Sequence, residues 1–212
     1  AAQIIIATDD PRIEAVAKGF GAHVCMTSAA HNSGTDRLQE VAAQLGLKPV
    51  DIIVNVQGDE PLIPPEVINQ VATNLATNIS ASVATLSEPI HSLDDFRNPN
   101  IVKAVADQTG KALYFSRAPI PWPRDHFAQA EVSALPGGFP AQRHIGIYAY
   151  RVALLNRFIT WPQATLEKIE SLEQLRVLAN GEAIHIAEAC TQVPGGVDTE
   201  ADLLRIKALL EN

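Results

Sequence analysis

The sequence predicts an α/β fold in which helices cover both faces of a mostly parallel, mixed sheet, giving three layers. Short apolar runs typical of strands alternate with longer segments whose apolar residues recur at helical spacing. Such alternation indicates parallel strands, because each crossover places a helix on one face of the sheet. A hairpin pattern in the middle of the chain adds antiparallel strands. No linker interrupts the elements, so residues 1–212 are expected to form a single domain.

The first half of the chain shows the clearest alternation. A strand at residues 3–8 precedes a helix that Asp10 caps and Pro11 begins. The apolar residues of this helix follow helical spacing: Ile13, Val16, Ala17 and Phe20. The next predicted strands are 23–26, 51–56 and 82–86, and the next predicted helices are 35–45 and 65–78.

The second half begins with a different pattern. Residues 101–106 and 111–116 alternate in polarity around a turn at 107–110, which predicts a β-hairpin. Residues 119–140 are rich in proline and glycine without a clear period, and we expect a long functional loop there. The remaining predicted elements are strands 142–150 and 184–187 and helices 166–178 and 199–210.

Composition limits the possible classes of function. The net charge of −8 and the isoelectric point near 5.2 argue against a nucleic-acid surface, which would need a basic patch. Small anionic substrates remain possible, because a few arginines can gather in one cleft. No apolar run approaches the roughly 18 residues of a membrane span, so no membrane partner is expected. Cys25 and Cys190 fit neither a disulfide framework nor a zinc spacing, and we expect buried free thiols in a reducing compartment.

The segment at residues 52–61 is the first candidate for chemistry. Its apolar run predicts a buried strand, which ends at Gln57 and Gly58 and is followed directly by Asp59 and Glu60. Open α/β sheets bind ligands at the C-terminal ends of their strands, and Mg²⁺ that carries substrate phosphates prefers carboxylate ligands. Gly58 lets the backbone approach a ligand closely, so Asp59 is the expected ligand. A solvated turn is the alternative.

Asp198 is the candidate partner of Asp59. It follows two glycines and precedes Thr199, which matches a capping box with Asp202 at the start of a helix. Taken alone, Asp198 would be part of that cap. Two carboxylates at two strand ends are what a bridging Mg²⁺ needs, so the two residues together predict a metal site.

Three further groups of polar residues could bind a ligand. Residues 31–37 place small polar side chains and a glycine before a helix, although an ordinary capped turn has the same pattern. Around the hairpin and loop lie Tyr114, Ser116, Arg117, Arg124, Arg143, His144 and Tyr148. Arginine recognises carboxylate or phosphate bidentately, whereas a plain surface charge is the alternative for each arginine. On predicted helix 166–178, one face carries Glu167, Glu170, Glu173 and Gln174, and a solvated stripe is the default interpretation.

Six sequence blocks, in order along nearly the whole chain, resemble the 3-deoxy-manno-octulosonate cytidylyltransferase family. They lie at residues 33–37, 54–61, 114–121, 144–148, 172–176 and 196–199. The resemblance implies cytidylyl transfer from CTP to 3-deoxy-D-manno-octulosonate (Kdo), which gives CMP-Kdo and pyrophosphate for lipopolysaccharide biosynthesis. It also implies a cytoplasmic homodimer with a nucleotide-binding, Rossmann-like α/β/α sandwich of the nucleotide-diphospho-sugar transferase type.

The resemblance implies roles for individual residues. Asp59 and Asp198 would be the catalytic Mg²⁺ ligands. The Kdo site would be lined by Gln57, Arg117, His144, Tyr148, Glu173 and Gln174. The cytidine nucleotide would be held by Ser33, Gly34, Thr35 and Arg37.

The present sequence departs from that family at its start. The family opens with a strand and a phosphate-binding loop of Pro-Ala-Arg and Arg-Leu-Pro-Gly-Lys type, and this segment is absent from residues 1–212. Ala1 leads within a few residues into an apolar strand, so we expect further residues to precede it in the intact protein. Two alternatives remain: a cytidylyltransferase for another acidic sugar such as sialic acid, and a non-catalytic nucleotide-sugar binding protein.

Overall fold

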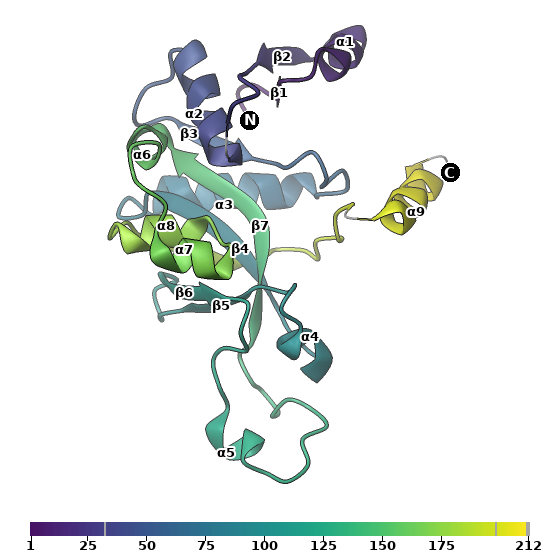
Figure 1. Cartoon of the computed structure of the whole chain (residues 1–212), viewed down its shortest axis with the longest axis vertical. Coiled ribbons are helices and arrows are strands. Elements are labelled where there is room, and N and C mark those ends of the chain that lie inside the picture. The colour runs from purple at the N-terminus through teal and green to yellow at the C-terminus, as the bar shows by residue number, and fades with distance from the viewer. Residues whose placement is uncertain (32, 198, 211–212) are drawn as a thin grey trace. The chain divides into compact units, whose positions relative to one another are not determined.

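The computed structural model describes residues 1–31, 33–197 and 199–210 (Figure 1). The chain divides into two compact units, one formed by residues 1–53 and 150–162 and the other by residues 54–149 and 163–212. The expectation of one nucleotidyltransferase domain over the whole chain stays a prediction. None of the described helices is long and apolar enough to cross a membrane.

The first unit begins with two short parallel strands and a helix between them. These elements are β1 (Ile5–Thr8), α1 (Pro11–Gly19) and β2 (His23–Met26). Asp10 caps α1 as expected, because its side chain accepts a hydrogen bond from the N–H of Arg12 at 2.8 Å. The predicted apolar face of α1 is buried only at Ala17, whereas Ile13, Val16 and Phe20 are exposed. Helical spacing therefore predicted the helix correctly, but it did not predict which of its apolar residues are buried.

The rest of the first unit includes α2 (Gly34–Gln44), the start of β3 (Ile52–Asn55), the end of β7 (Gln142–Arg151) and α6 (Val152–Phe158). Ser33 caps α2 by accepting the N–H of Asp36 at 3.2 Å. The apolar residues at helical spacing in this segment are buried at Leu38, Val41 and Ala42, whereas Leu45 is exposed. Helix α6 is short, packs against α2 and was not predicted from the sequence.

The second unit contains most of a mixed six-stranded sheet. Its further strands are β4 (Val83–Pro89), β5 (Lys103–Ala106), β6 (Ala112–Ser116), β7 (Gln142–Arg151) and β8 (Ile184–Glu188). The strand order is β6-β5-β7-β4-β8, and β3 also pairs with β7. Strands β4 and β8 are parallel, whereas β5 is antiparallel to both β6 and β7. The hairpin therefore makes the sheet mixed, as predicted.

Helices cover the sheet of the second unit on both faces. Figure 1 shows α3 (Pro65–Thr77) behind the sheet and α7 (Thr165–Glu170) and α8 (Gln174–Ala179) in front of it. Val67, Val71 and Leu75 of α3 are fully buried, at the spacing that predicted this helix. The last helix, α9 (Glu200–Leu210), begins beside the predicted capping box, in which Asp202 N–H donates to the hydroxyl of Thr199 at 3.2 Å.

The prediction of one continuous helix over residues 166–178 is wrong. Ser171 has a φ of 52°, in the left-handed region that ends helices, and it separates α7 from α8. The N–H of Leu172 then donates to the carbonyl of Glu167 at 3.2 Å, which satisfies one of the last carbonyls of α7. The segment is therefore two short helices in place of the one predicted.

The long loop at 119–140 has a small core of its own. It contains the short helix α5 (Arg124–Phe127), and the preceding segment contains α4 (Leu93–Arg97), both missed by the sequence analysis. Phe96 of α4 is fully buried and packs edge-on against Phe139, with ring centroids 5.4 Å apart. The ring centroids of Phe127 and Phe96 lie 6.2 Å apart. This aromatic cluster gives the segment fixed structure despite its proline and glycine content.

Candidate active site

The turn after β3 carries Asp59. The N–H of Glu60 donates to the carbonyl of Gln57 at 3.1 Å, which closes a tight turn just past the strand. The Asp59 side chain is exposed, and its carboxylate makes no hydrogen bond or ion pair with any described residue. The amide of Gln57 lies 3.5 Å from the carbonyl of Gly146 on β7, a long and weak contact. The carboxylate of Asp59 is therefore free to take a ligand.

Gln70 on α3 holds the start of the chain segment that leads from β8 towards Asp59. Its amide donates to the carbonyl of Glu188 at 2.7 Å and accepts the N–H of Cys190 at 2.8 Å. Cys190 is exposed, so the expectation of buried thiols is wrong for this residue, while Cys25 is buried and both are free.

An ion pair holds the middle of the same segment. Arg143 of β7 contacts the carboxylate of Glu88 on β4 at 2.5 Å. The other oxygen of Glu88 accepts the N–H of Val193 at 2.6 Å, and Arg143 donates to the carbonyl of Val193 at 3.2 Å. Both polar groups of the Val193 backbone are thus satisfied by one charged pair. Arg143 is a structural clamp here rather than a plain surface charge.

The end of the segment lies against the Asp59 turn. The N–H of Val197 donates to the carbonyl of Asp59 at 2.8 Å. Gly196 lies so close that a Cβ atom there would be 2.9 Å from the same carbonyl and 3.2 Å from a carboxylate oxygen of Glu60. Asp198, the predicted second carboxylate, lies outside the described residues. Val197, the residue before Asp198 in the sequence, therefore lies next to Asp59. The prediction that Asp59 and Asp198 hold Mg²⁺ stays untested.

The donor chemistry of the Asp59 turn fits a hard divalent cation. Among residues 1–31, 33–197 and 199–210 there is no group of three or more His, Cys, Asp or Glu side chains that could hold a metal. That search does not include Asp198. A free, exposed carboxylate such as that of Asp59 is the kind of oxygen donor that Mg²⁺ takes in small number beside substrate phosphates.

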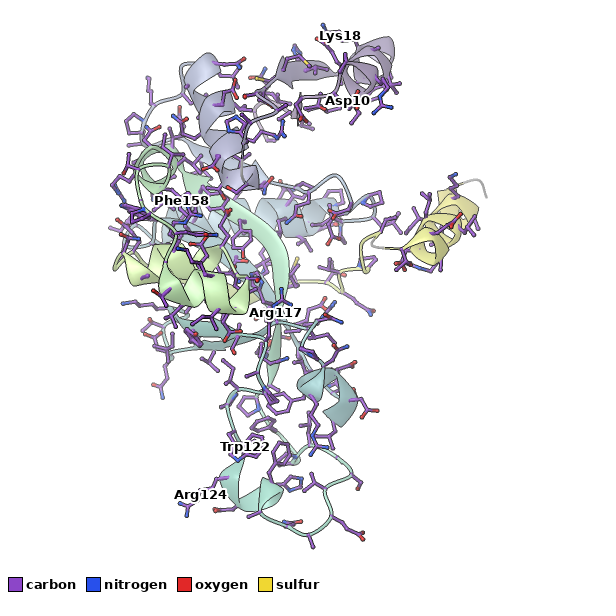
Figure 2. All side chains as sticks on the ribbon, in the orientation of Figure 1. Asp10, Lys18, Arg117, Trp122, Arg124 and Phe158 are labelled. Atoms are coloured by element: carbon purple, nitrogen blue, oxygen red, sulfur yellow. The ribbon has the colours of Figure 1, made fainter. Side chains whose placement is uncertain are left out.

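Arg117 follows β6 and is labelled in Figure 2, where Trp122 and Arg124 lie further out on the α5 loop. Its guanidinium donates to three backbone carbonyls: Glu170 at 2.7 Å, Pro99 at 3.0 Å and Ser171 at 3.5 Å. No described carboxylate forms an ion pair with it. Neutral carbonyls orient the cation without cancelling its charge, so Arg117 can still attract an anion.

His144 and Tyr148 lie on β7 with ring centroids 5.3 Å apart, so the shared face expected from their spacing is observed. The imidazole of His144 also packs against Phe115, and its Nε2 lies 2.9 Å from the hydroxyl of Thr85. Burial lowers the pKa of His144 from 6.5 to about 3, because the packed surroundings disfavour the charged form. His144 is therefore neutral at physiological pH and can act as a hydrogen-bonding and stacking group.

Glu173 and Gln174 lie at the start of α8, and the side chain of Gln174 is buried. Glu167 is also buried, at 3% exposure, and pairs with Arg176 at 2.5 Å. Burial alone would raise the pKa of Glu167, but hydrogen bonds from Arg176 and Ala164 and the charge of Arg176 outweigh it and lower that pKa. The interpretation of this segment as a solvated stripe is therefore wrong for Glu167, which supports the fold from within.

The predicted nucleotide-binding residues lie in the first unit, around the start of α2. Ser33 is the N-cap, Gly34 begins the helix and Thr35 is buried. Arg37 donates to the hydroxyl of Thr27 and pairs with Asp9 at 3.2 Å. The carboxylate of Glu40 orders the loop before this helix. These contacts hold a preorganised helix start, and the assignment of the four residues to nucleotide stays a prediction.

Comparisons with known proteins show the family of this chain. A family model described as cytidylyltransferase matches residues 1–184. The chain belongs to the cytidylyltransferase family. Divalent metals serve as cofactors in nucleotidyl transfer generally, because they offset the charge of the phosphates, so a cofactor of this kind is consistent with the family.

Several curated relatives align with almost the whole of this chain. The 3-deoxy-manno-octulosonate cytidylyltransferase of Cellvibrio japonicus (strain Ueda107) is 79% identical over 208 residues, which cover 98% of the chain and 82% of that protein. The protein with the same name from Saccharophagus degradans (strain 2-40 / ATCC 43961 / DSM 17024) is 58% identical, with 100% of the chain and 84% of that protein covered.

Solved structures give the same result. CMP:2-keto-3-deoxy-manno-octonic acid synthetase complexed with CTP matches with a TM-score of 0.87 and 38% identity over 99% of this chain and 80% of that one. 4-Diphosphocytidyl-2C-methyl-D-erythritol synthase matches with a TM-score of 0.57 at 12% identity, covering 97% of this chain and 78% of that one. The second match shows a shared fold alone, that of the nucleotidyltransferases expected from the sequence.

The sequence analysis missed the residues that hold the site together. Glu88 and Gln70 were not singled out, and Glu170 was named only within a group of polar residues whose default interpretation was a solvated stripe. Their hydrogen-bond partners lie 53 to 120 positions away along the chain. Local spacing carries no signal for such contacts.

Proposed function

We propose that this chain catalyses cytidylyl transfer from CTP to Kdo, giving CMP-Kdo and pyrophosphate. The observation that carries the proposal is the 79% identity, over 98% of the chain, to the 3-deoxy-manno-octulosonate cytidylyltransferase of Cellvibrio japonicus. The solved relative that contains CTP supports the choice of nucleotide. An oriented but unneutralised Arg117 supports an acidic second substrate.

The reaction is a substitution at the α-phosphorus of CTP. The anomeric hydroxyl oxygen of Kdo forms a bond to this phosphorus, the bond to the β-phosphate oxygen breaks, and the hydroxyl proton is lost to solvent. Pyrophosphate leaves with the electron pair of the broken bond. In such transfers catalysis consists mainly of positioning and charge stabilisation, so no protein nucleophile is required.

Arg117 would bind the carboxylate of Kdo. A guanidinium has five N–H groups, and only three of those of Arg117 have partners among the described residues. The remaining N–H groups could donate to a carboxylate. Because that carboxylate adjoins the anomeric carbon of Kdo, its binding would also fix the attacking hydroxyl.

The other predicted sugar-site residues would complete recognition of the sugar. A neutral His144 in tilted ring contact with Tyr148 offers uncharged hydrogen bonds and ring surface to the hydroxyl groups of Kdo. The side chains proposed to line the site with them are Gln57, Glu173 and Gln174. The cytidine nucleotide would be held at the start of α2 by Ser33, Gly34, Thr35 and Arg37.

Asp59 and Asp198 would hold Mg²⁺. Bound there, the ion would offset the negative charge of the phosphates. The contact between Val197 and Asp59 supports this pairing, because Asp198 is the next residue after Val197 in the sequence. The carboxylate of Asp59, free of partners among the described residues, supports its role as a ligand.

The proposal extends to the setting of the enzyme. We infer a cytoplasmic homodimer that supplies CMP-Kdo for lipopolysaccharide biosynthesis. Light scattering coupled to gel filtration tests the dimer, since a monomer mass at micromolar concentration would contradict it. Neither nucleic acid nor a membrane is expected as a partner.

A pyrophosphate-release assay with CTP and parallel acidic sugars tests the proposed substrate. We expect release with Kdo and none above background with sialic acid. Release with sialic acid alone would support the alternative sugar, and binding of CMP-Kdo without any release would support the non-catalytic alternative.

A further inference from the structure

Glu170, the last residue of α7, contacts two consecutive residues at the end of β6. One carboxylate oxygen accepts the hydroxyl of Ser116 at 2.7 Å, and the other accepts the backbone N–H of Arg117 at 2.9 Å. The backbone carbonyl of Glu170 accepts Nε of Arg117 at 2.7 Å. Glu170 therefore fixes both the main chain and the side chain of Arg117.

The guanidinium of Arg117 lies at the C-terminus of α7. Its contacts with the carbonyls of Glu170 and Ser171 are contacts with the last acceptors of that helix, where cations are favoured. Its contact with the carbonyl of Pro99 ties it to the turn before β5. If the end of α7 moved, the direction of the guanidinium would change with it.

Lys103 gives Glu170 a second effect on Arg117. This lysine is fully buried, and its Nζ donates to the carbonyls of Asn98 at 2.8 Å and of Ile101. Burial and the charge of nearby Arg117 lower the pKa of Lys103, whereas the charge of Glu170 raises it. Lys103 and Arg117 are thus two positive charges near each other, and the negative charge of Glu170 offsets their repulsion.

We propose that Glu170 is a positioning residue for acidic-sugar recognition, acting by holding Arg117 in the orientation that receives the substrate carboxylate. The inference rests on the proposed function, in which Arg117 binds that carboxylate. A purely structural role, in which Glu170 only joins α7 to β6, is the competing explanation.

The test compares Glu170→Ala, Glu170→Gln and the control Glu182→Ala. Glu182 also accepts a serine hydroxyl, that of Ser82 at 2.5 Å, and is not among the contacts of Arg117. We expect Glu170→Ala to raise the KM for Kdo about 10- to 100-fold, as small misplacements of a binding group do, with the KM for CTP changed less than about twofold. Glu170→Gln should restore most of the loss, because its amide oxygen can accept the N–H of Arg117 and its NH₂ can donate to Ser116.

The double variant Arg117→Ala with Glu170→Ala separates the explanations. If Glu170 acts through Arg117, the second substitution adds nothing to the KM for Kdo in the Arg117→Ala background. The proposal would be overturned if the two substitutions had additive effects on the KM for Kdo, or if Glu170→Ala changed the KM for Kdo and the KM for CTP equally. Loss of thermal stability in Glu170→Ala with an unchanged KM for Kdo would also overturn it, in favour of the structural role.

A second readout does not depend on the identity of the substrate. In ¹⁵N-arginine-labelled protein, the Nε resonance of Arg117 should shift in Glu170→Ala and keep nearly its wild-type position in Glu170→Gln and Glu182→Ala. An unchanged resonance in Glu170→Ala would overturn the positioning role. If the wild-type protein uses a different acidic sugar, the choice of Kdo fails, and the KM comparison is made with the sugar that is used.

Discussion

Val197 donates its backbone N–H to the carbonyl of Asp59 across 2.8 Å, and this hydrogen bond joins two segments 138 positions apart in the sequence. One segment is the turn after β3, and the other is held by Gln70 and by the Glu88–Arg143 pair before it reaches Asp59. A carboxylate site built from both segments therefore depends on contacts outside the site.

Substitution Asp59→Ala should abolish turnover while leaving the fold intact. The carboxylate is exposed and has no partner among the described residues, so its removal leaves no buried group unsatisfied. We expect pyrophosphate release to fall by at least about a hundredfold, as loss of a metal ligand does, with little change in the melting temperature. The control is Glu66→Ala, at an exposed carboxylate on α3. Near-normal turnover in Asp59→Ala would rule out its role as a metal ligand.

Substitution Gly196→Ala should separate the two segments that meet at Asp59. The added Cβ would lie 2.9 Å from the carbonyl of Asp59, a distance that forces backbone to move. We expect a loss of about 1–3 kcal/mol in the free energy of unfolding, together with a large loss of activity. Gly195→Ala is the matched control, because nothing lies within 4 Å of a Cβ there. Equal behaviour of the two variants would contradict the close approach.

Breaking the Glu167–Arg176 pair should destabilise the second unit. Glu167→Gln removes the buried negative charge that pairs with Arg176, and breaking a buried ion pair costs about 3–5 kcal/mol. The pKa of Glu167 is lowered in the folded state, so its stabilising contribution is present above the unfolded value near 4.5 and is lost as the pH falls through the folded value. The free energy of unfolding, measured with urea at several pH values, should fall less steeply with falling pH in Glu167→Gln than in the wild-type protein. An equally steep acid loss in both proteins would contradict the assignment.

His144 should remain neutral through the physiological range. Its folded pKa of about 3 lies below the unfolded value of 6.5, so the unfolded chain binds a proton first as the pH falls. His144 therefore lowers stability by up to about 1.4 kcal/mol per pH unit between these two values and has no such effect above 6.5. An imidazole NMR titration, assigned with His144→Gln, should show no protonation of this ring between pH 5 and 8. A midpoint near 6.5 would contradict the burial argument.

The sequence was a good guide wherever the signal was local. The alternating strands, the Asp10 cap, the Thr199 capping box and the hairpin follow from neighbours in the chain, and each is observed. Asp59 could be selected because a carboxylate just past an apolar strand is itself a local pattern.

The rest depended on tertiary contacts. A left-handed Ser171 splits the predicted helix 166–178, and no local residue preference demands that conformation of a serine. Glu167 looked solvated because its partner, Arg176, becomes a neighbour only after that break. Helix α1 shows the opposite difference, because its apolar pattern suggests a buried face and most of that face is exposed.

Transfer of the cytidylyl group to Kdo can be followed by ³¹P NMR of the purified protein with CTP, Kdo and Mg²⁺. We expect the three CTP resonances to disappear together, while one phosphodiester resonance of CMP-Kdo and the resonance of pyrophosphate appear in equal amounts. Unchanged CTP, or its conversion to CDP and inorganic phosphate with no phosphodiester to Kdo, would contradict the account.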